Sequence, residues 1–231
     1  MKDESYGHFK GVWETPEIAE AYRDERFSRS RRWQWTDRRE RQIVTRLLSV
    51  FTAGTRGLDI PCGAGRFFPV FREIGLRHVG ADVSLAMVRL VPTLTGSRSA
   101  LTADALSLPF AAESFNFILS IRLLHRIHDS TIRVRMLREM ARVSRGPLLV
   151  TYYARWNLRG IQRWLRGKHP GVSLSEVRRD AETAGLQVRE AVPLRRWTQQ
   201  QWFFVLDPIF PCDRVVSRIP FGSPAHLSGP P

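Results

Sequence analysis

The clearest chemistry lies in a short segment that combines an acidic residue with two glycines. Residues 58–66 read LDIPCGAGR, in which an apolar strand runs into a turn and then into a predicted helix. Gly63 and Gly65 let the backbone approach a ligand where a Cβ atom would collide with it. Asp59, at the strand end, can accept hydrogen bonds from a cationic amine. Such turns also hold mononucleotides and dinucleotides, so the segment alone leaves the class of ligand open.

Two further acidic residues follow the next two predicted strands. Asp82 ends the second strand, and Asp104 follows the third. The first carboxylate can accept hydrogen bonds from ribose hydroxyls, and the second from an exocyclic adenine amine. Three acids at successive strand ends describe an adenosyl ligand lying across the carboxyl edge of a parallel sheet. The alternative is a structural turn with surface acids in an α/β protein that binds no such ligand.

With these motifs the chain resembles the class I S-adenosylmethionine-dependent methyltransferases, in particular the small-molecule branch known as type 11. The resemblance extends over about residues 38–206. It implies S-adenosyl-L-methionine as cofactor, S-adenosyl-L-homocysteine as product, no metal, and in-line displacement at the sulfonium methyl. The matching stretches are 57–66, 79–84, 102–110, 114–129 and 138–151.

The resemblance assigns the cofactor-binding residues along three strand ends. It implies that Asp59, Gly63 and Gly65 face the methionine part of the cofactor. It also implies that Asp82 holds the ribose, with Val83 beside the adenine.

Farther along the chain, Asp104 and Ala105 would flank the adenine, and Ser120 and Ile121 would border the transferring methyl group. His125 is the candidate catalytic residue, as a general base that takes a proton from an acceptor hydroxyl or amine. The alternative for His125 is a packing role at the start of a helix.

Three departures from the family pattern stand out. Pro61 replaces the first glycine of the turn, and Asn116 replaces the aspartate that usually begins the fourth strand. The common His-His-x-x-Asp motif reads HRIHD over residues 125–129. Only its first histidine and its aspartate are kept, so a catalytic second histidine is not expected.

Strands and helices alternate along most of the chain, which predicts an α/β, doubly wound, Rossmann-like sheet that is mainly parallel. The resemblance implies seven strands in the order 3-2-1-4-5-7-6, with strand 7 antiparallel and helices on both faces. Strands 6 and 7 are expected to form an antiparallel hairpin at the sheet edge. The strands are predicted near 57–60, 78–82, 99–103, 115–120, 147–153, 187–192 and 201–206. Helices are predicted near 36–51, 67–74, 84–90, 131–143 and 173–184.

The predicted organisation has three parts. Residues 1–40 would form a lid or cap segment, residues 41–206 the methyltransferase domain, and residues 207–231 a flexible tail containing proline and glycine. The aromatic residues of the first part could cover the cofactor or belong to an ordinary core.

The formal net charge is +14, and almost all of the positive charge is arginine. A field of this sign attracts nucleic acid, acidic lipid head groups or phosphorylated metabolites. The alternative is a solvated surface without a partner. The composition is that of a folded globular protein, with no apolar run long enough to span a bilayer. The polar N-terminus lacks the features of a signal peptide and favours a cytoplasmic location.

A basic amphipathic helix is predicted over residues 155–166. Arg155, Arg159, Arg163 and Arg166 recur on one face and could contact an anionic membrane surface. The alternative is a solvated arginine face.

These features predict an enzyme that transfers a methyl group from S-adenosylmethionine to a small-molecule or lipid-like acceptor. Nucleic acid is judged less favoured, because the chain lacks an added RNA-binding module and an Asn-Pro-Pro-Tyr motif of base-amino methyltransferases. Two alternatives stay open. One is a non-catalytic adenosyl-binding protein, and the other is an arginine-rich nucleic-acid or membrane-surface binder on the same fold.

Overall fold

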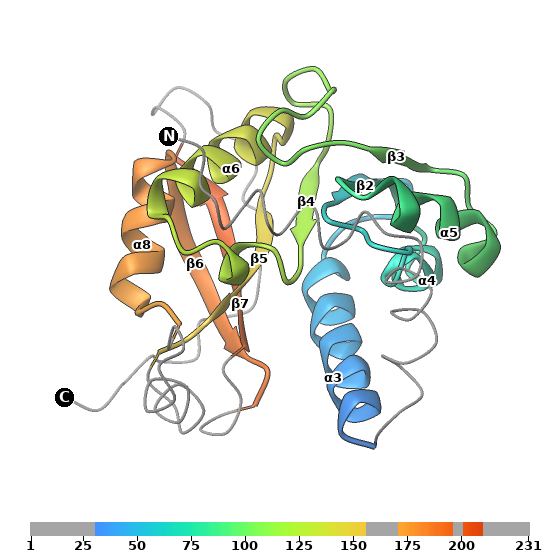
Figure 1. Cartoon of the computed structure of the whole chain (residues 1–231), viewed down its shortest axis with the longest axis horizontal. Helices are drawn as coiled ribbons and strands as arrows, with labels where there is room; N and C mark the ends of the chain where they lie inside the picture. The colour runs from blue at the N-terminus through green and yellow to red at the C-terminus, as the bar shows by residue number, and fades with distance from the viewer. Residues whose placement is uncertain (1–30, 156–170, 196–200, 210–231) are drawn as a thin grey trace.

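The computed structural model describes residues 31–155, 171–195 and 201–209. Within these ranges one sheet is flanked by helices (Figure 1). The predicted lid and tail lie mostly outside the described residues, so the three-part organisation stays a prediction. The first described helix, α3 (Arg31–Leu48), runs across residue 40 as one continuous element.

Seven strands form the sheet in the order β3-β2-β1-β4-β5-β7-β6. The five strands from β1 to β5 pair in parallel, whereas β7 is antiparallel to both β5 and β6. This confirms the predicted α/β architecture, the strand order and the edge hairpin. The strands are β1 (Arg56–Asp59), β2 (Arg77–Asp82), β3 (Ala100–Thr102), β4 (Phe117–Ser120), β5 (Leu148–Tyr153), β6 (Leu186–Pro193) and β7 (Gln201–Pro208).

The helices fall close to the predicted positions. Helix α3 begins at Arg31 rather than near Thr36, which is buried inside the helix. Ser84 caps α5 by accepting a hydrogen bond from the Met87 backbone amide, and the predicted capping box of Ser173 and Glu176 opens α8. The remaining helices and their bounds are α4 (Phe68–Glu73), α5 (Leu85–Thr95), the 3-10 turn η1 (Leu124–Arg126), α6 (Ser130–Val143) and α8 (Leu174–Thr183).

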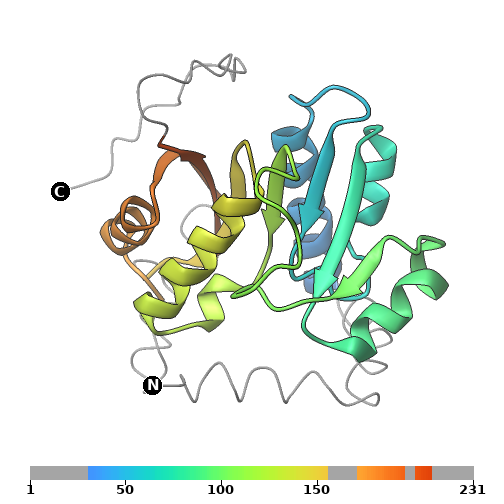
Figure 2. The same ribbon diagram turned by 90° about the horizontal axis from the view of Figure 1, so that it is seen from above.

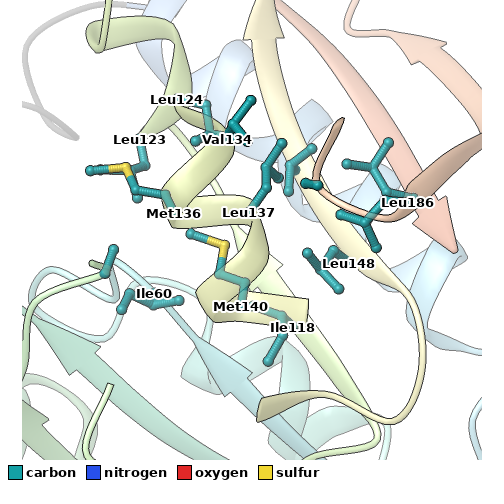
Figure 3. Packing of buried hydrophobic residues seen from close by; sticks show 14 of the residues in the cluster. Ile60, Ile118, Leu123, Leu124, Val134, Met136, Leu137, Met140, Leu148 and Leu186 are labelled. Carbon is teal, nitrogen blue, oxygen red and sulfur yellow. The ribbon is translucent and has the colours of Figure 1, made fainter. Parts of the chain in front are cut away.

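Helices cover both faces of the sheet (Figure 2). Helices α3 and α4 pack on one face, in a cluster that includes Leu47, Phe71 and Phe117. Helices α6 and α8 cover the other face, where Met140 packs in a cluster with Leu148 (Figure 3). Strand β5 contributes side chains to both clusters, which explains why its sequence is a continuous apolar run rather than an alternating one.

Helix α6 also buries a charge that its apolar pattern does not reveal. The Arg133 side chain is 3% exposed, and its Nε donates to Asp180 Oδ2 of α8 at 2.6 Å. Arg133 Nη1 donates to the backbone oxygens of Ile127 and His128 at 3.0 and 2.8 Å. The ion pair therefore joins α6, α8 and the loop that follows β4.

Removing one partner of this pair should destabilise the fold strongly. Asp180→Asn leaves the Arg133 cation buried without its counter-ion, and we expect a loss of about 3–5 kcal/mol in the free energy of unfolding. Denaturant unfolding followed by circular dichroism measures it. The matched control is Glu190→Gln, which breaks the exposed pair with Arg46 and should cost less than about 1 kcal/mol. Equal losses in the two variants would contradict a special role for the buried pair.

Candidate functional site

The carboxyl ends of β1, β2 and β4 meet around the glycine turn. The Ile60 amide donates to Leu119 O of β4 at 2.9 Å, and the Cys62 amide donates to Ala81 O of β2 at 2.9 Å. The bond between Ile60 and Pro61 is cis. The turn is thus anchored between the two neighbouring strands, and the residues that follow it are held at the sheet edge.

The two glycines of the turn have different structural roles. Both have positive φ angles, 53° at Gly63 and 80° at Gly65, which disfavour any side chain. A Cβ atom on Gly63 would stand in open space. A Cβ atom on Gly65 would lie 2.7 Å from Cγ2 of Thr95, at the end of α5. Gly65 is therefore needed for packing against α5, whereas Gly63 keeps the space beside the turn clear.

Asp59 ends β1 with a carboxyl group that is completely buried. Neither of its side-chain oxygens has a hydrogen-bond partner among the described residues. Burial, and next the nearby Asp82 carboxylate, raise the pKa of Asp59 well above its usual value, although Arg66 acts in the opposite direction. A buried carboxyl group without a partner is unfavourable in the free protein, and a cationic ligand would relieve it.

Asp82 ends β2 and is 7% exposed. Its Oδ2 accepts from the Gly63 amide at 2.8 Å, and its Oδ1 accepts from the Ser84 amide at 2.9 Å. Burial raises the pKa of Asp82 despite these backbone hydrogen bonds. The carboxylate therefore fixes the glycine turn against the start of α5. Each of its oxygens keeps a lone pair for a further donor such as a ribose hydroxyl.

The residues predicted around an adenine lie at the neighbouring strand end. Asp82 pairs with Thr102 of β3, so Asp104 follows at the same edge. Asp104 is half-buried, and its Oδ1 accepts from the Leu106 amide at 3.0 Å. Ala105 is buried and Val83 is half-buried. The structure thus brings these residues to the edge that carries Asp82.

Ser120 and Ile121 occupy the end of β4, next to β1. Ser120 is completely buried, and its hydroxyl has no hydrogen-bond partner within the described chain. Ile121 is 5% exposed. With Asp59, the sheet edge thus holds two buried polar groups whose hydrogen-bonding capacity is unused.

His125 lies in η1, on the loop between β4 and α6. Its ring stacks on that of Tyr153, the last residue of β5, with centroids 3.7 Å apart and planes inclined by 14°. The loop is fixed by Arg133, which donates to the two backbone carbonyls described above. His125 therefore stands at the carboxyl edge, whereas His128 on the same loop is exposed.

The sequence did not predict a cluster of charges that joins α3 to the site. Glu40 of α3 is completely buried and pairs with two arginines, Arg66 after the glycine turn and Arg122 after β4. Arg122 Nη2 donates to Glu40 Oε1 at 2.6 Å, and Arg66 Nε donates to Asp37 Oδ1 at 2.7 Å. Burial alone would raise the pKa of Glu40, but Arg66 and Arg122 outweigh it and lower the pKa.

One pattern in the sequence could have revealed this cluster. Glu40 shares a helical face with Ile43, Val44 and Leu47, all of which are buried. A carboxylate on an apolar helix face requires a cationic partner, because burial of an unpaired charge is too costly. The identity of that partner could not be read from the spacing, since Arg122 is 82 residues away in sequence.

The departures from the family pattern have structural explanations. Asn116 precedes β4 at the opposite edge of the sheet, where its Oδ1 accepts from the Arg56 amide at 3.2 Å. Cys62 is buried, and burial, followed by the charges of Asp59 and Asp82, raises the pKa of its thiol well above the usual value. The thiol is therefore neutral and unsuited to act as a nucleophile.

Of the predicted basic helix over residues 155–166, only Arg155 lies within the described residues, where it is in a bend. Arg155 is half-exposed, and its Nη2 pairs with Glu176 Oε2 at 3.1 Å. Arg159, Arg163 and Arg166 lie outside the described residues, so membrane contact stays a prediction. Across the described ranges, no helix is both long enough and apolar enough to cross a membrane. The same ranges contain no group of three or more His, Cys, Asp and Glu side chains that could hold a metal ion.

Comparisons with known proteins find a methyltransferase domain in part of the chain. The fold matches magnesium protoporphyrin IX methyltransferase (ChlM) from Synechocystis PCC 6803 with bound SAH, at a TM-score of 0.69 and 14% identity, covering 88% of this chain and 99% of that one. It also matches the PH0226 protein from Pyrococcus horikoshii OT3, at a TM-score of 0.64 and 16% identity, covering 82% and 98%. Residues 58–147 match the methyltransferase domain family. The chain therefore contains a methyltransferase domain, built on the fold that the sequence predicts.

Curated relatives of this methyltransferase domain carry names of tRNA enzymes. The tRNA (carboxymethyluridine(34)-5-O)-methyltransferase of Saccharomyces cerevisiae is 30% identical over 148 residues, which cover 63% of this chain and 49% of that protein. The protein of Xenopus tropicalis named tRNA (carboxymethyluridine(34)-5-O)-methyltransferase alkbh8 is 25% identical over 164 residues, covering 71% and 25%. The chain spans about half or less of the length of these relatives.

The sequence predicts S-adenosyl-L-methionine as the cofactor, and the structurally similar magnesium protoporphyrin IX methyltransferase is known with SAM bound. The orphaned polar groups of the site fit it. The buried Asp59 carboxyl group suits the cationic amino group of the methionine part, and the open space beside Gly63 leaves room for it. Each oxygen of Asp82 keeps a lone pair beyond its backbone hydrogen bond, and these lone pairs suit the ribose hydroxyls.

We expect Asp59 to lower the free energy of unfolding of the ligand-free protein, although it contributes to cofactor binding. Because its pKa is raised in the folded state, the protein loses stability as pH rises from the unfolded pKa of about 4 through the folded pKa. We expect Asp59→Asn to remove this loss and to raise the free energy of unfolding at pH 7 by about 1–3 kcal/mol. The same variant should weaken S-adenosylhomocysteine binding by about 1.5–3 kcal/mol.

Thermal unfolding across pH 4 to 8 and calorimetric titration check the two effects. Glu182→Gln, an exposed carboxylate on α8, is the matched control and should change neither quantity. Loss of stability in Asp59→Asn at neutral pH, or unchanged ligand affinity, would contradict this assignment.

Proposed function

We propose that this domain transfers a methyl group from S-adenosylmethionine to an oxygen of a tRNA nucleoside. The observation that carries the proposal is the set of relatives named as tRNA methyltransferases, the first of which is matched over 63% of this chain. The net charge of +14 supports a polyanionic acceptor. The small-molecule or lipid-like acceptor favoured by the sequence is the alternative.

The absence of an Asn-Pro-Pro-Tyr motif does not exclude a nucleic-acid acceptor. The Asn-Pro-Pro-Tyr motif serves methylation of amino groups on bases, whereas the name of the yeast relative specifies transfer to an oxygen. An oxygen acceptor does not call for that motif. An added RNA-binding module is also unnecessary if the domain's own basic surface contacts the RNA.

The cofactor-binding residues are proposed from their positions at the sheet edge. Asp59 would accept from the amino group of the cofactor, and Asp82 from the ribose hydroxyls. Bound there, S-adenosylmethionine supplies a methyl group that is already activated by the sulfonium charge. The chain's own work is then to align the acceptor and to exclude water. The full set of proposed cofactor-binding residues is Asp59, Gly63, Gly65, Asp82, Val83, Asp104, Ala105, Ser120 and Ile121.

We assign His125 to the acceptor side of the site. It stands at the end of β5, beside Tyr153 and one strand away from Ser120. For a neutral hydroxyl it would take the proton as the methyl group is transferred. An acceptor that is already a carboxylate needs no base, and His125 would then orient the attacking oxygen. The pH profile of turnover separates these two roles.

We expect His125→Ala to lower kcat by about 100-fold or more, as the loss of a general base does, with the affinity for S-adenosylhomocysteine unchanged. Steady-state kinetics at saturating cofactor and calorimetry measure the two quantities. Tyr153→Phe keeps the ring stack and is the matched control, with turnover close to that of the unmodified protein. Wild-type turnover in His125→Ala would remove His125 from the reaction.

The acceptor itself is tested with S-adenosylmethionine labelled in its methyl group. The protein is incubated separately with total tRNA, with a tRNA-free metabolite extract and with anionic lipid vesicles. We expect label in tRNA only, located by mass spectrometry of the digested nucleosides, and lost with His125→Ala. Label confined to metabolites or lipids would overturn the tRNA acceptor and leave the methyltransferase intact. No label in any fraction, together with no S-adenosylhomocysteine binding, would overturn methyl transfer as well.

A further inference from the structure

Two tryptophans stand exposed near the start of α3. Trp33 is 44% exposed and Trp35 is 39% exposed. Each indole has an arginine beside it, with the guanidinium carbon of Arg122 5.6 Å from the Trp33 ring centroid and that of Arg195 5.7 Å from the Trp35 ring centroid. An exposed indole beside a guanidinium group offers a ring face and a positive charge together, which suits the stacking of a nucleic-acid base.

Both pairs lie at the edge of the sheet that carries the cofactor site. One and two turns beyond Trp33, Asp37 and Glu40 contact the arginines that follow the glycine turn and β4. Arg195 follows β6, which runs parallel to β5 because each is antiparallel to β7. The start of α3 therefore lies at the carboxyl edge, beside the ends of β4 and β6 (Figure 1).

The Trp33 pair is also connected to the place of methyl transfer. Arg122 directly follows Ile121, which the proposed site places beside the transferring methyl group. The Arg122 amide donates to Thr151 Oγ1 of β5 at 2.7 Å, and its side chain is held by the buried Glu40. Trp33 is thus positioned against a rigid part of the site rather than on a free surface loop.

The exposed surface of α3 carries no negative charge. Its only acidic residues, Asp37 and Glu40, face inward and are paired with arginines. The exposed charged side chains with described placement are Arg31, Arg38, Arg39 and Arg46. A helix that presents indoles and arginines without a single exposed carboxylate is complementary to a polyanion with aromatic groups.

We propose that Trp33 and Trp35, which project from different sides of α3, form a two-part stacking platform on which each indole stacks one unpaired base of the RNA acceptor, while the exposed arginines of α3 contact its phosphates. This inference rests on the proposed tRNA acceptor. Single-stranded bases offer their faces to aromatic side chains, whereas a duplex conceals them. The platform therefore selects an unpaired loop and delivers it to the cofactor edge.

The test measures binding of a fluorescent 12-nucleotide single-stranded RNA and of the same sequence as a duplex, by anisotropy at several salt concentrations. We expect Trp33→Ala and Trp35→Ala each to weaken single-strand binding by about 5- to 150-fold, with little effect on the duplex. Trp33→Phe and Trp35→Phe should retain most of the affinity, because a phenyl ring still stacks. Unchanged S-adenosylhomocysteine affinity in all four variants shows that the fold and the cofactor site persist.

The exposed arginines of α3 should affect the salt dependence of RNA binding instead. The double variant Arg38→Gln with Arg39→Gln should reduce the slope of log affinity against log salt by about 1.4 units, whereas the tryptophan variants should leave the slope unchanged. Arg178→Gln with Arg179→Gln, on α8 across the sheet, is the matched control and should change neither affinity nor slope.

The outcomes separate this inference from the proposed function. Unchanged RNA binding in Trp33→Ala and Trp35→Ala overturns the platform, even if tRNA is methylated. Loss of RNA binding in those variants supports it, even if label from the cofactor never enters tRNA, in which case the proposed acceptor fails alone. Binding of the unmodified protein to anionic vesicles but not to RNA would overturn the platform in favour of a membrane surface.

Discussion

The burial of the Asp59 carboxyl group is the constraint on which the site depends. It is fully enclosed at the end of β1, and no hydrogen bond within the described chain satisfies its oxygens. Asp82, nearby, adds a second carboxylate and raises the pKa of Asp59 further. The fold tolerates this because the hydrogen bonds of Asp82 to the Gly63 and Ser84 amides hold the turn around it. A cationic ligand beside Asp59 would make the buried carboxylate energetically favourable.

A second buried carboxylate, Glu40, joins the cofactor turn to the acceptor side. Its two oxygens pair with Arg66 and Arg122, which belong to loops after different strands. Breaking either pair would leave an uncompensated charge, so α3 is bound firmly to both loops. The same helix carries the exposed indoles. The chain thus ties cofactor binding and the proposed RNA contact to a single helix.

The sequence predicted those parts that depend on local pattern. Alternating strands and helices indicated the sheet, and the spacing of Asp59, Asp82 and Asp104 placed three acids at one edge, where the structure brings them together. It could not predict the partners of Glu40 or Arg133, because these are set by packing between distant segments. It also could not distinguish Gly63, which faces open space, from Gly65, which packs against α5. The missing motifs could not identify the methyl acceptor, because the absence of a motif excludes only the chemistry that the motif serves.

The central claim is that Asp59 receives the cationic amino group of the cofactor, and proton release on binding tests it most directly. Burial raises the pKa of Asp59 in the free protein, so its ionisation against that amine should release protons at pH values between its ordinary pKa and the raised one. Calorimetric titration with S-adenosylhomocysteine in two buffers of different ionisation enthalpy measures the number released. We expect tight binding with proton release that disappears in Asp59→Asn. Release of the same size in that variant, or no binding to the folded protein, would contradict it.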